Sequence, residues 1–424
     1  RLCGSVSNAD TTIPHDPLAV CPQCNADPTH YRRIDVREPL GFGSTRGEDF
    51  DGSFSWTGGA GAVRALGNPN SFPGVTHRRM EARSGQSMRL VLNDNNGKQF
   101  RFRKAKPGTG RDRAYWPGYY ALDALDWPNV IDANDLEPAV LEVALGAAQH
   151  TDIAFFGGLA QVDAEAGVRA NLARRQQPGG MPDLNDGRRA AWYSLAFMIR
   201  TAAAAYMDVQ PNEFSAEIHI GRRGTEQAVW AFLADTLENG AGFSTHLASE
   251  DEFPLFVDRI ETLIAEWEDD DHSKNCSASC YKCLRDYANM RYHALLDWRL
   301  AKDLFEVSLG QPLIVPPDYG SDILNGWGQA YGAAPATQTQ TGAYILIARQ
   351  AGTAAVLVRH PLEAYEEGPN SVVTPRLSST ADDLYASQTF DAVVAIDSLS
   401  LDRTPRAALE LIDTALTSLN GVSW

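Results

Sequence analysis

Apolar side chains recur at helical spacing in the middle of the chain, with polar positions between them. One set runs from Trp192 to Tyr206 and another from Phe256 to Trp267, each with apolar residues three or four positions apart. Such spacing places the apolar residues on one face of an amphipathic helix, which can then pack on a core. These patterns predict two helices, and a third is expected over 284–305.

Shorter segments show the two-residue alternation of strands, or the continuous apolar run of a buried strand. Residues 88–92 and 99–102 flank the polar cluster Asn93–Gly97 and predict a β-hairpin. Residues 151–156 predict a buried strand, and residues 214–220 alternate. The first quarter of the chain is therefore expected to be rich in β structure.

After Pro312 the pattern changes again. Three apolar runs, over 344–347, 355–358 and 392–396, predict strands, and residues 405–417 predict a terminal helix. This order is typical of a small α/β unit.

The length of 424 residues exceeds what one ordinary core supports, so the chain is expected to form several domains. The predicted class is α+β or α/β, multidomain. The expected units are a β-rich domain over 1–134, a mixed α/β zinc-binding domain over 135–310 and a small α/β unit over 311–424.

Composition and charge narrow the class of function. Hydrophobic residues make up 44% of the chain, yet no apolar run is long enough to cross a bilayer, and the start, Arg1-Leu2-Cys3-Gly4, has no signal-peptide core. The net charge of -17 argues against a general phosphate-binding surface, because affinity for nucleic acid comes mainly from Lys and Arg. The net charge does not exclude a local basic groove, since Arg101, Arg103 and Lys104 lie close together in the first quarter of the chain.

The six cysteines form two groups with short gaps, which favours metal binding in a reducing cytoplasm over a disulfide framework. Cys276-x3-Cys280-x2-Cys283 supplies three thiolates for a tetrahedral Zn²⁺ ion. His272 is the first candidate for the fourth ligand, and His293 is the second. Three thiolates favour a structural zinc over a catalytic one, which would keep a water ligand.

The second group, Cys3, Cys21 and Cys24, resembles a zinc ribbon that lacks one ligand. His15 or His30, or a residue before Arg1, are the candidates to complete it. The Cys21-Pro-Gln-Cys24 pair alone is also compatible with redox chemistry, but zinc is preferred because no thioredoxin-like setting surrounds it.

Motifs for an ATPase motor are absent from the sequence. There is no Gly-x4-Gly-Lys-Ser/Thr loop and no DEAD or DEAH box, so no catalytic residue is assigned. The enzymatic alternative is a metal-dependent nuclease built on Asp152 and Glu217. A structural role for both carboxylates is favoured, because the lysine usual in that motif is missing.

Several blocks in order resemble the MrfA zinc-binding (MZB) domain family, over roughly residues 150–310. The blocks are Ser194–Arg200, Met207–Glu213, Ala234–Phe243 and Cys276–Asn289, followed by His293 and Leu296-Asp297. The family's zinc cysteines match Cys276, Cys280 and Cys283, whereas its usual upstream cysteine is replaced here by the segment 273–275. Such domains occur near the C-terminus of DEAD/DEAH-box DNA helicases and in DrmB of the DISARM antiphage system.

The resemblance implies a non-catalytic, zinc-binding accessory subunit or tail of a DNA helicase complex, in antiphage defence or DNA repair. Its expected partners are a helicase or ATPase subunit and DNA. Three arginines after the cysteines, Arg285, Arg291 and Arg299, lie at near-helical spacing and are predicted to contact phosphate. The alternatives are the nuclease named above and the C-terminal fragment of a single large DEAD/DEAH-box helicase.

Overall fold

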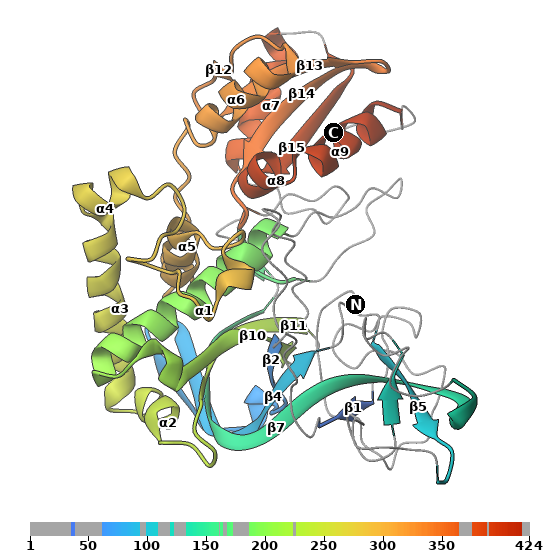
Figure 1. Cartoon of the computed structure of the whole chain (residues 1–424). Helices are drawn as coiled ribbons and strands as arrows, with labels where there is room; N and C mark the ends of the chain where they lie inside the picture. Colours follow the sequence, from blue (N-terminus) through green and yellow to red (C-terminus); the bar gives the residue numbers. More distant parts are fainter. Residues whose placement is uncertain are drawn as a thin grey trace.

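The computed structural model confirms a mixed α/β class, with two main sheets and helices packed on them (Figure 1). None of the helices it describes combines the length and apolar character needed to cross a membrane. The residues described are 35–38, 62–93, 99–108, 119–122, 133–160, 162–163, 168–172, 186–223, 226–363, 375–387 and 390–417.

The larger sheet is built on one long strand, β7 (Leu136–Ala160). The antiparallel neighbours of its C-terminal half are β4 (Met80–Asn93) on one side and β11 (Glu226–Asp235) on the other. Outside them lie β10 (Phe214–Arg223), which pairs with β11, and β2 (Ala62–Ala65) and β3 (Gly74–His77), which pair with β4. The short β1 (Val36–Arg37) runs parallel to β7.

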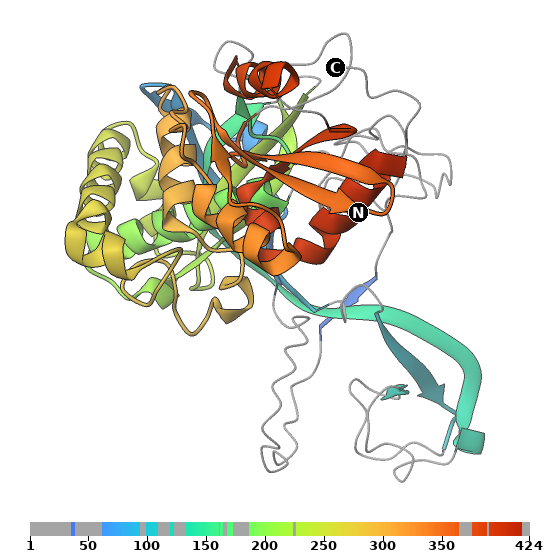
Figure 2. The same cartoon turned by 90° about the horizontal axis from the view of Figure 1, so that it is seen from above.

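The hairpin expected over 88–102 is wrong, although both of its strands exist. β5 (Phe100–Ala105) pairs with β6 (Tyr119–Ala121) and with the first half of β7, not with β4. Asn93 lies opposite Leu145 and Phe100 lies opposite Val143, so β4 and β5 follow each other along β7 in the same direction. The longer strand offers both segments a partner, and Figure 2 shows its β5 end projecting away from the helices.

The helices expected over 192–206 and 256–267 are confirmed as α1 (Asp186–Met207) and α3 (Glu252–Glu268). Together with α2 (Phe243–Leu247), they cover one face of the larger sheet, and α5 (Trp298–Ser308) packs on α1 (Figure 1). Because side chains alternate along β7, Phe156 packs with Phe253 and Phe256 in this core, while Phe155 packs with Phe232 on the other face.

The third expected helix, over 284–305, is wrong in its first half. Residues 284–297 form turns and the 3-10 helix η7 (Met290–Tyr292), and α5 begins only at Trp298. The Asn289 side chain donates to the Leu284 carbonyl and accepts from the Asp286 N–H, so these backbone groups bond to a side chain instead of a helix. Asp297 then caps α5 by accepting from the Arg299 N–H.

The C-terminal part contains the expected strands and terminal helix. β13 (Ala343–Arg349), β14 (Gly352–Arg359) and β15 (Ala392–Asp397) form a sheet with the short β12 (Thr337–Gln338), and β14 and β15 are parallel. Around it pack α6 (Ser321–Tyr331), α7 (Pro375–Ser387), α8 (Ser398–Arg403) and α9 (Pro405–Thr417).

Contacts join this part to the helices below it. His360 Nε2 lies 3.1 Å from Asp303 Oδ2 on α5, and Arg403 bonds to the Ala294 carbonyl. The expected domain boundaries near residues 134 and 310 stay predictions. The larger sheet takes strands from both sides of residue 134.

A carboxylate with no solvent exposure, that of Glu217, lies on β10 between cationic groups from two other elements. Arg64 Nη1 on β2 and Arg291 Nη2 in η7 each lie 2.9 Å from its oxygens, and Tyr193 on α1 also hydrogen-bonds to it. Burial raises the pKa of Glu217, and the two arginines counteract this rise. The cluster therefore ties the sheet to the segment before α5.

We predict that Glu217→Gln destabilises the protein by about 3–5 kcal/mol, because two arginines would remain without their buried counter-charge. The urea-unfolding midpoint measures the effect. Glu261→Gln is the matched control, since Glu261 pairs with Arg78 at the surface and such pairs contribute about 1 kcal/mol or less. Equal losses in both variants would contradict the prediction.

Candidate metal centre

Four potential zinc ligands come from a short helix and the loop that follows it. After α3, the Asp269 side chain caps the six-residue helix α4 (Asp270–Asn275), which carries His272. Cys276 ends that helix, and Cys280 and Cys283 follow in tight turns. We call residues 276–297 the metal-site loop.

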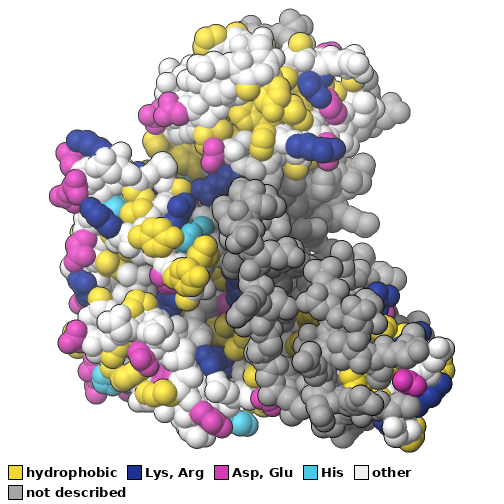
Figure 3. All heavy atoms as spheres, in the orientation of Figure 1, with side chains coloured by type: hydrophobic (Ala, Val, Ile, Leu, Met, Phe, Trp, Pro, Cys, Tyr) yellow, Lys and Arg dark blue, Asp and Glu magenta, His cyan; other side chains and the backbone are white. Residues whose placement is uncertain are grey.

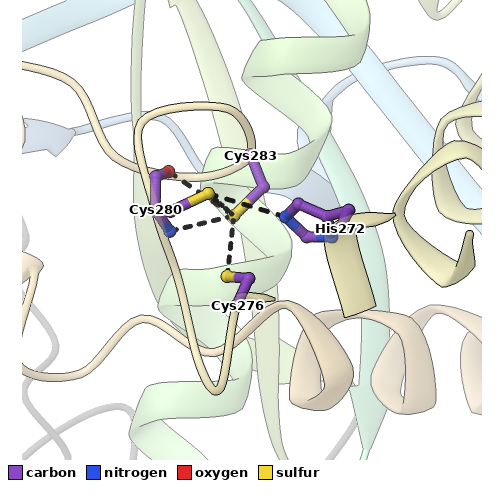
Figure 4. Close-up of side chains that lie close together, drawn as sticks. All are labelled: His272, Cys276, Cys280 and Cys283. Carbon is purple, nitrogen blue, oxygen red and sulfur yellow. Dashed lines mark hydrogen bonds between the residues drawn. The ribbon is translucent and has the colours of Figure 1, made fainter. Parts of the chain in front are cut away.

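The four ligand atoms lie within 4.8 Å of one another, which is close enough to hold one metal ion (Figure 4). Cys280 Sγ is 3.6 Å from His272 Nε2 and 3.7 Å from Cys283 Sγ, and the sulfurs of Cys276 and Cys283 are 3.9 Å apart. Zinc–sulfur bonds of about 2.3 Å in a tetrahedron place sulfurs about 3.8 Å apart. The cluster therefore fits a zinc ion.

His272 has an orientation suited to metal binding. Its Nδ1 lies 2.9 Å from the Trp267 carbonyl, so Nδ1 carries the proton and Nε2 faces the thiols with its lone pair. The ring lies near the rings of Trp267 and Trp298, at 6.3 and 5.5 Å between centroids. A carbonyl partner of this kind fixes the tautomer and orientation of a zinc-bound histidine.

Arg299 and Trp298, at the start of α5, hold the backbone beside the ligands. Arg299 donates to the carbonyls of Ser273, Cys276 and Ser277 at 2.9–3.0 Å. The Trp298 indole N–H donates to the Cys276 carbonyl at 3.3 Å, and the Arg299 guanidinium lies 4.3 Å from the Trp298 ring centre. Arg299 is therefore a positioning residue for the cluster.

The three thiols differ in acidity when no metal is bound. Burial raises the pKa of Cys276 and of Cys283, so their thiols keep their protons at neutral pH. Burial disfavours the charged form of Cys280 as well, but the Lys282 N–H donates a hydrogen bond to its sulfur at 3.4 Å and helps to lower the pKa of this thiol to about 7. Backbone N–H groups also point at the sulfurs, with the Cys280 N–H 3.1 Å from Cys283 Sγ. These bonds favour thiolates, the form that binds zinc.

Of the two histidines left open by the sequence, the structure brings His272 to the thiols. His293 Nε2 instead bonds to the Asp286 carbonyl and to Asn289 Oδ1, and its ring meets the edge of Tyr281.

The second cysteine group, Cys3, Cys21 and Cys24, lies outside the described residues. Trp267 was expected only as an apolar residue of a helix, and neither it nor Trp298 was predicted to lie beside the metal site. The sequence signal for this place was an aromatic residue near each end of the Cys/His cluster.

The six basic residues expected to bind nucleic acid lie in two parts of the structure, near the metal site and on β5. Arg299 donates to the Cys276 carbonyl in the metal-site loop, and Arg291 pairs with Glu217. Arg285 is half-buried and donates to Ser279 Oγ at 2.9 Å. The remaining three, Arg101, Arg103 and Lys104, lie on β5, where Arg101 and Lys104 are exposed and Arg103 is half-buried. Contact with DNA stays a prediction for all six residues.

The carboxylates of the nuclease alternative have structural partners. Asp152 accepts from the Gly242 N–H, and Asp235 accepts from the Ala241, Phe243 and Ser244 N–H groups at the start of α2. Burial and the neighbouring Asp235 raise the pKa of Asp152. Within the described part of the chain, the group of His, Cys, Asp or Glu side chains close enough for a metal is the His272 cluster, which includes neither Asp152 nor Glu217.

Comparison with known proteins assigns no family. No protein-family model matches the chain, and no curated protein matches it. A solved structure of the DUF1998 helicase MrfA bound to DNA is a weak structural neighbour, with 11% sequence identity and a TM-score of 0.32. The match covers 59% of this chain and 24% of that chain, so this chain spans about a quarter of the helicase's length.

We predict that His272→Ala weakens zinc affinity by at least about tenfold, since even groups that only support a ligand change affinity by 10–100-fold. Competition with a chromophoric chelator measures this affinity. His293→Ala is the matched control and should retain the wild-type value, because its imidazole faces Asp286 and Asn289. The reverse order of the two variants would place the fourth ligand at His293.

We also predict that Arg299→Gln loosens zinc by about tenfold, because three backbone carbonyls next to the ligands lose their common donor. Elemental analysis after dialysis against chelator reports the loss, and Arg406→Gln serves as an exposed control on α9. A variant that keeps its zinc and loses only DNA affinity would instead make Arg299 a phosphate contact.

Proposed function

We propose that this chain is a non-catalytic, zinc-binding part of a DNA helicase complex, either an accessory subunit or a tail, and that it contributes contacts to DNA and to the helicase. The observation that carries the proposal is the closed cluster of His272, Cys276, Cys280 and Cys283. It lies within the segment of roughly residues 150–310 that resembles the MZB domain family, and its three cysteines match that family's zinc cysteines.

The donor set favours a structural ion. Three thiols and one imidazole fill the four corners of a tetrahedron, so no corner is left for a water molecule or a substrate. Cys276 and Cys283 are buried in the main core together with Leu284 and Leu296. When bound, zinc would cross-link α4 to the metal-site loop and so fix the surface that this loop presents.

The non-catalytic role is supported by the sequence and by the partners of the candidate acids. The chain contains no phosphate-binding loop of the Gly-x4-Gly-Lys-Ser/Thr type, so ATP turnover is assigned to a partner subunit or another domain. Glu217 is neutralised by Arg64 and Arg291, which leaves it unsuited to coordinate a catalytic cation. A DISARM-like antiphage system or DNA repair is the proposed setting, on the resemblance alone.

The purified chain tests this proposal directly. We expect it to bind labelled DNA at low salt, to hydrolyse no ATP with or without DNA, and to leave DNA intact in Mg²⁺ or Mn²⁺. Isolation from its native source should recover an ATPase with it. ATP hydrolysis or DNA cleavage by the zinc-loaded chain would contradict the non-catalytic role, and absence of any DNA affinity would contradict the DNA-binding role.

A further inference from the structure

Two tyrosines project into solvent from the metal-site loop. Tyr281 is 69% exposed and Tyr287 is 88% exposed, the highest values among the aromatic residues in the described part of the chain. Exposed aromatic rings bury a large area at small entropic cost when a ligand covers them. Both rings stand on the outer side of a loop whose inner side is packed.

The inner side of the loop is firmly held. Tyr292 packs on Tyr193 and Phe197 of α1, with ring centroids 4.7 and 5.1 Å apart. Arg291 pairs with buried Glu217, and Arg200 of α1 pairs with Asp286. These contacts fix the backbone on both sides of Tyr287.

The position of Tyr281 is set by a neighbour. Its ring meets His293 edge-on at 5.7 Å, and the His293 Nε2–H donates to Asp286 and Asn289. The loop therefore presents both tyrosines from a preformed backbone, and this lowers the entropy lost when a ligand binds.

Positive charge accompanies the two rings. Lys282 is exposed and Arg285 is half-buried, and neither has an acidic partner among the described residues. The one acid between them and Tyr287, Asp286, is paired with Arg200. In Figure 3, hydrophobic side chains, a class that includes tyrosine, gather beside Lys, Arg and His in front of α1 and α5. This local charge contrasts with the net charge of -17 for the chain.

We infer that the metal-site loop binds unpaired nucleotides of single-stranded DNA, with bases stacked on Tyr281 and Tyr287 and phosphates near Lys282 and Arg285. The inference rests on the proposed DNA-binding function and assigns it a ligand and a site. Aromatic rings next to cations are the combination that single strands require, because stacking needs a free base face. An apolar protein partner fits less well, since Leu284 and Leu296 of this loop are buried and Leu295 packs against the main core.

The test measures the affinity of the zinc-loaded full chain for a fluorescent oligothymidylate, by anisotropy. Tyr281→Ala and Tyr287→Ala should each weaken binding by about tenfold, the scale of one stacked base. Lys282→Ala should lower the salt dependence of binding by about one phosphate contact. Tyr287→Phe keeps the ring and should bind as the wild type does. Tyr385→Ala, at a half-exposed tyrosine of α7, is the control for loss of an unrelated ring.

The outcomes separate this inference from the proposed function. If the wild type binds the oligonucleotide and both alanine variants match it with zinc retained, the site is elsewhere, while the DNA-binding role stands. Binding to duplex alone overturns the single-strand ligand, and no DNA binding overturns both proposals. Sedimentation without DNA adds a further arm: a dimer that Tyr287→Ala converts to monomer would make a second copy the occupant of this surface.

Discussion

Four side chains within 4.8 Å of one another organise a segment that has almost no regular structure of its own. Between α4 and α5 the chain forms turns and one 3-10 helix, η7, so backbone ladders do not hold it. The cysteines and His272 close its first part, and Arg299 holds the same backbone through three carbonyls. Without these constraints the loop would lose the shape that positions its exposed residues, because a metal site of this kind contributes directly to folding.

The metal-site loop is also connected to the sheet, through Arg291 and the buried carboxylate of Glu217. Arg64 of β2 reaches the same carboxylate from the other side, so three segments far apart in the sequence meet at one charge. Groups that share a partner are energetically coupled. A change at Arg64 of β2 is therefore expected to alter the backbone of the metal-site loop through Glu217.

Elements with strong periodicity could be predicted from local sequence patterns. The segments predicted wrongly were those whose structure depends on partners distant in the sequence or on side-chain bonds to the backbone. The stripe from Trp192 to Tyr206 predicted α1 because a helix with that face has one way to bury it. The spacing of Cys276, Cys280 and Cys283 predicted the candidate site, since short gaps bring thiols together regardless of fold. The segment after Leu284 looked helical, but the Asn289 side chain bonds the backbone there. The pairing of β4 and β5 with β7 depended on a strand too distant for local turn signals to reveal.

The length of β7 has a consequence for how the chain tolerates change. Phe155 and Phe156 pack in cores on opposite faces of the larger sheet, and the N-terminal half of the same strand pairs with β5. Inserting one residue near the middle of the strand would exchange the two faces for everything on one side of the insertion. A bulge is the means by which a strand absorbs such an extra residue, and the ladder between β7 and β11 already has a shift at Val229/Trp230. An extra residue within β7 is therefore expected to be tolerated only where a bulge forms, so that the two faces of the sheet keep their side chains on either side of it.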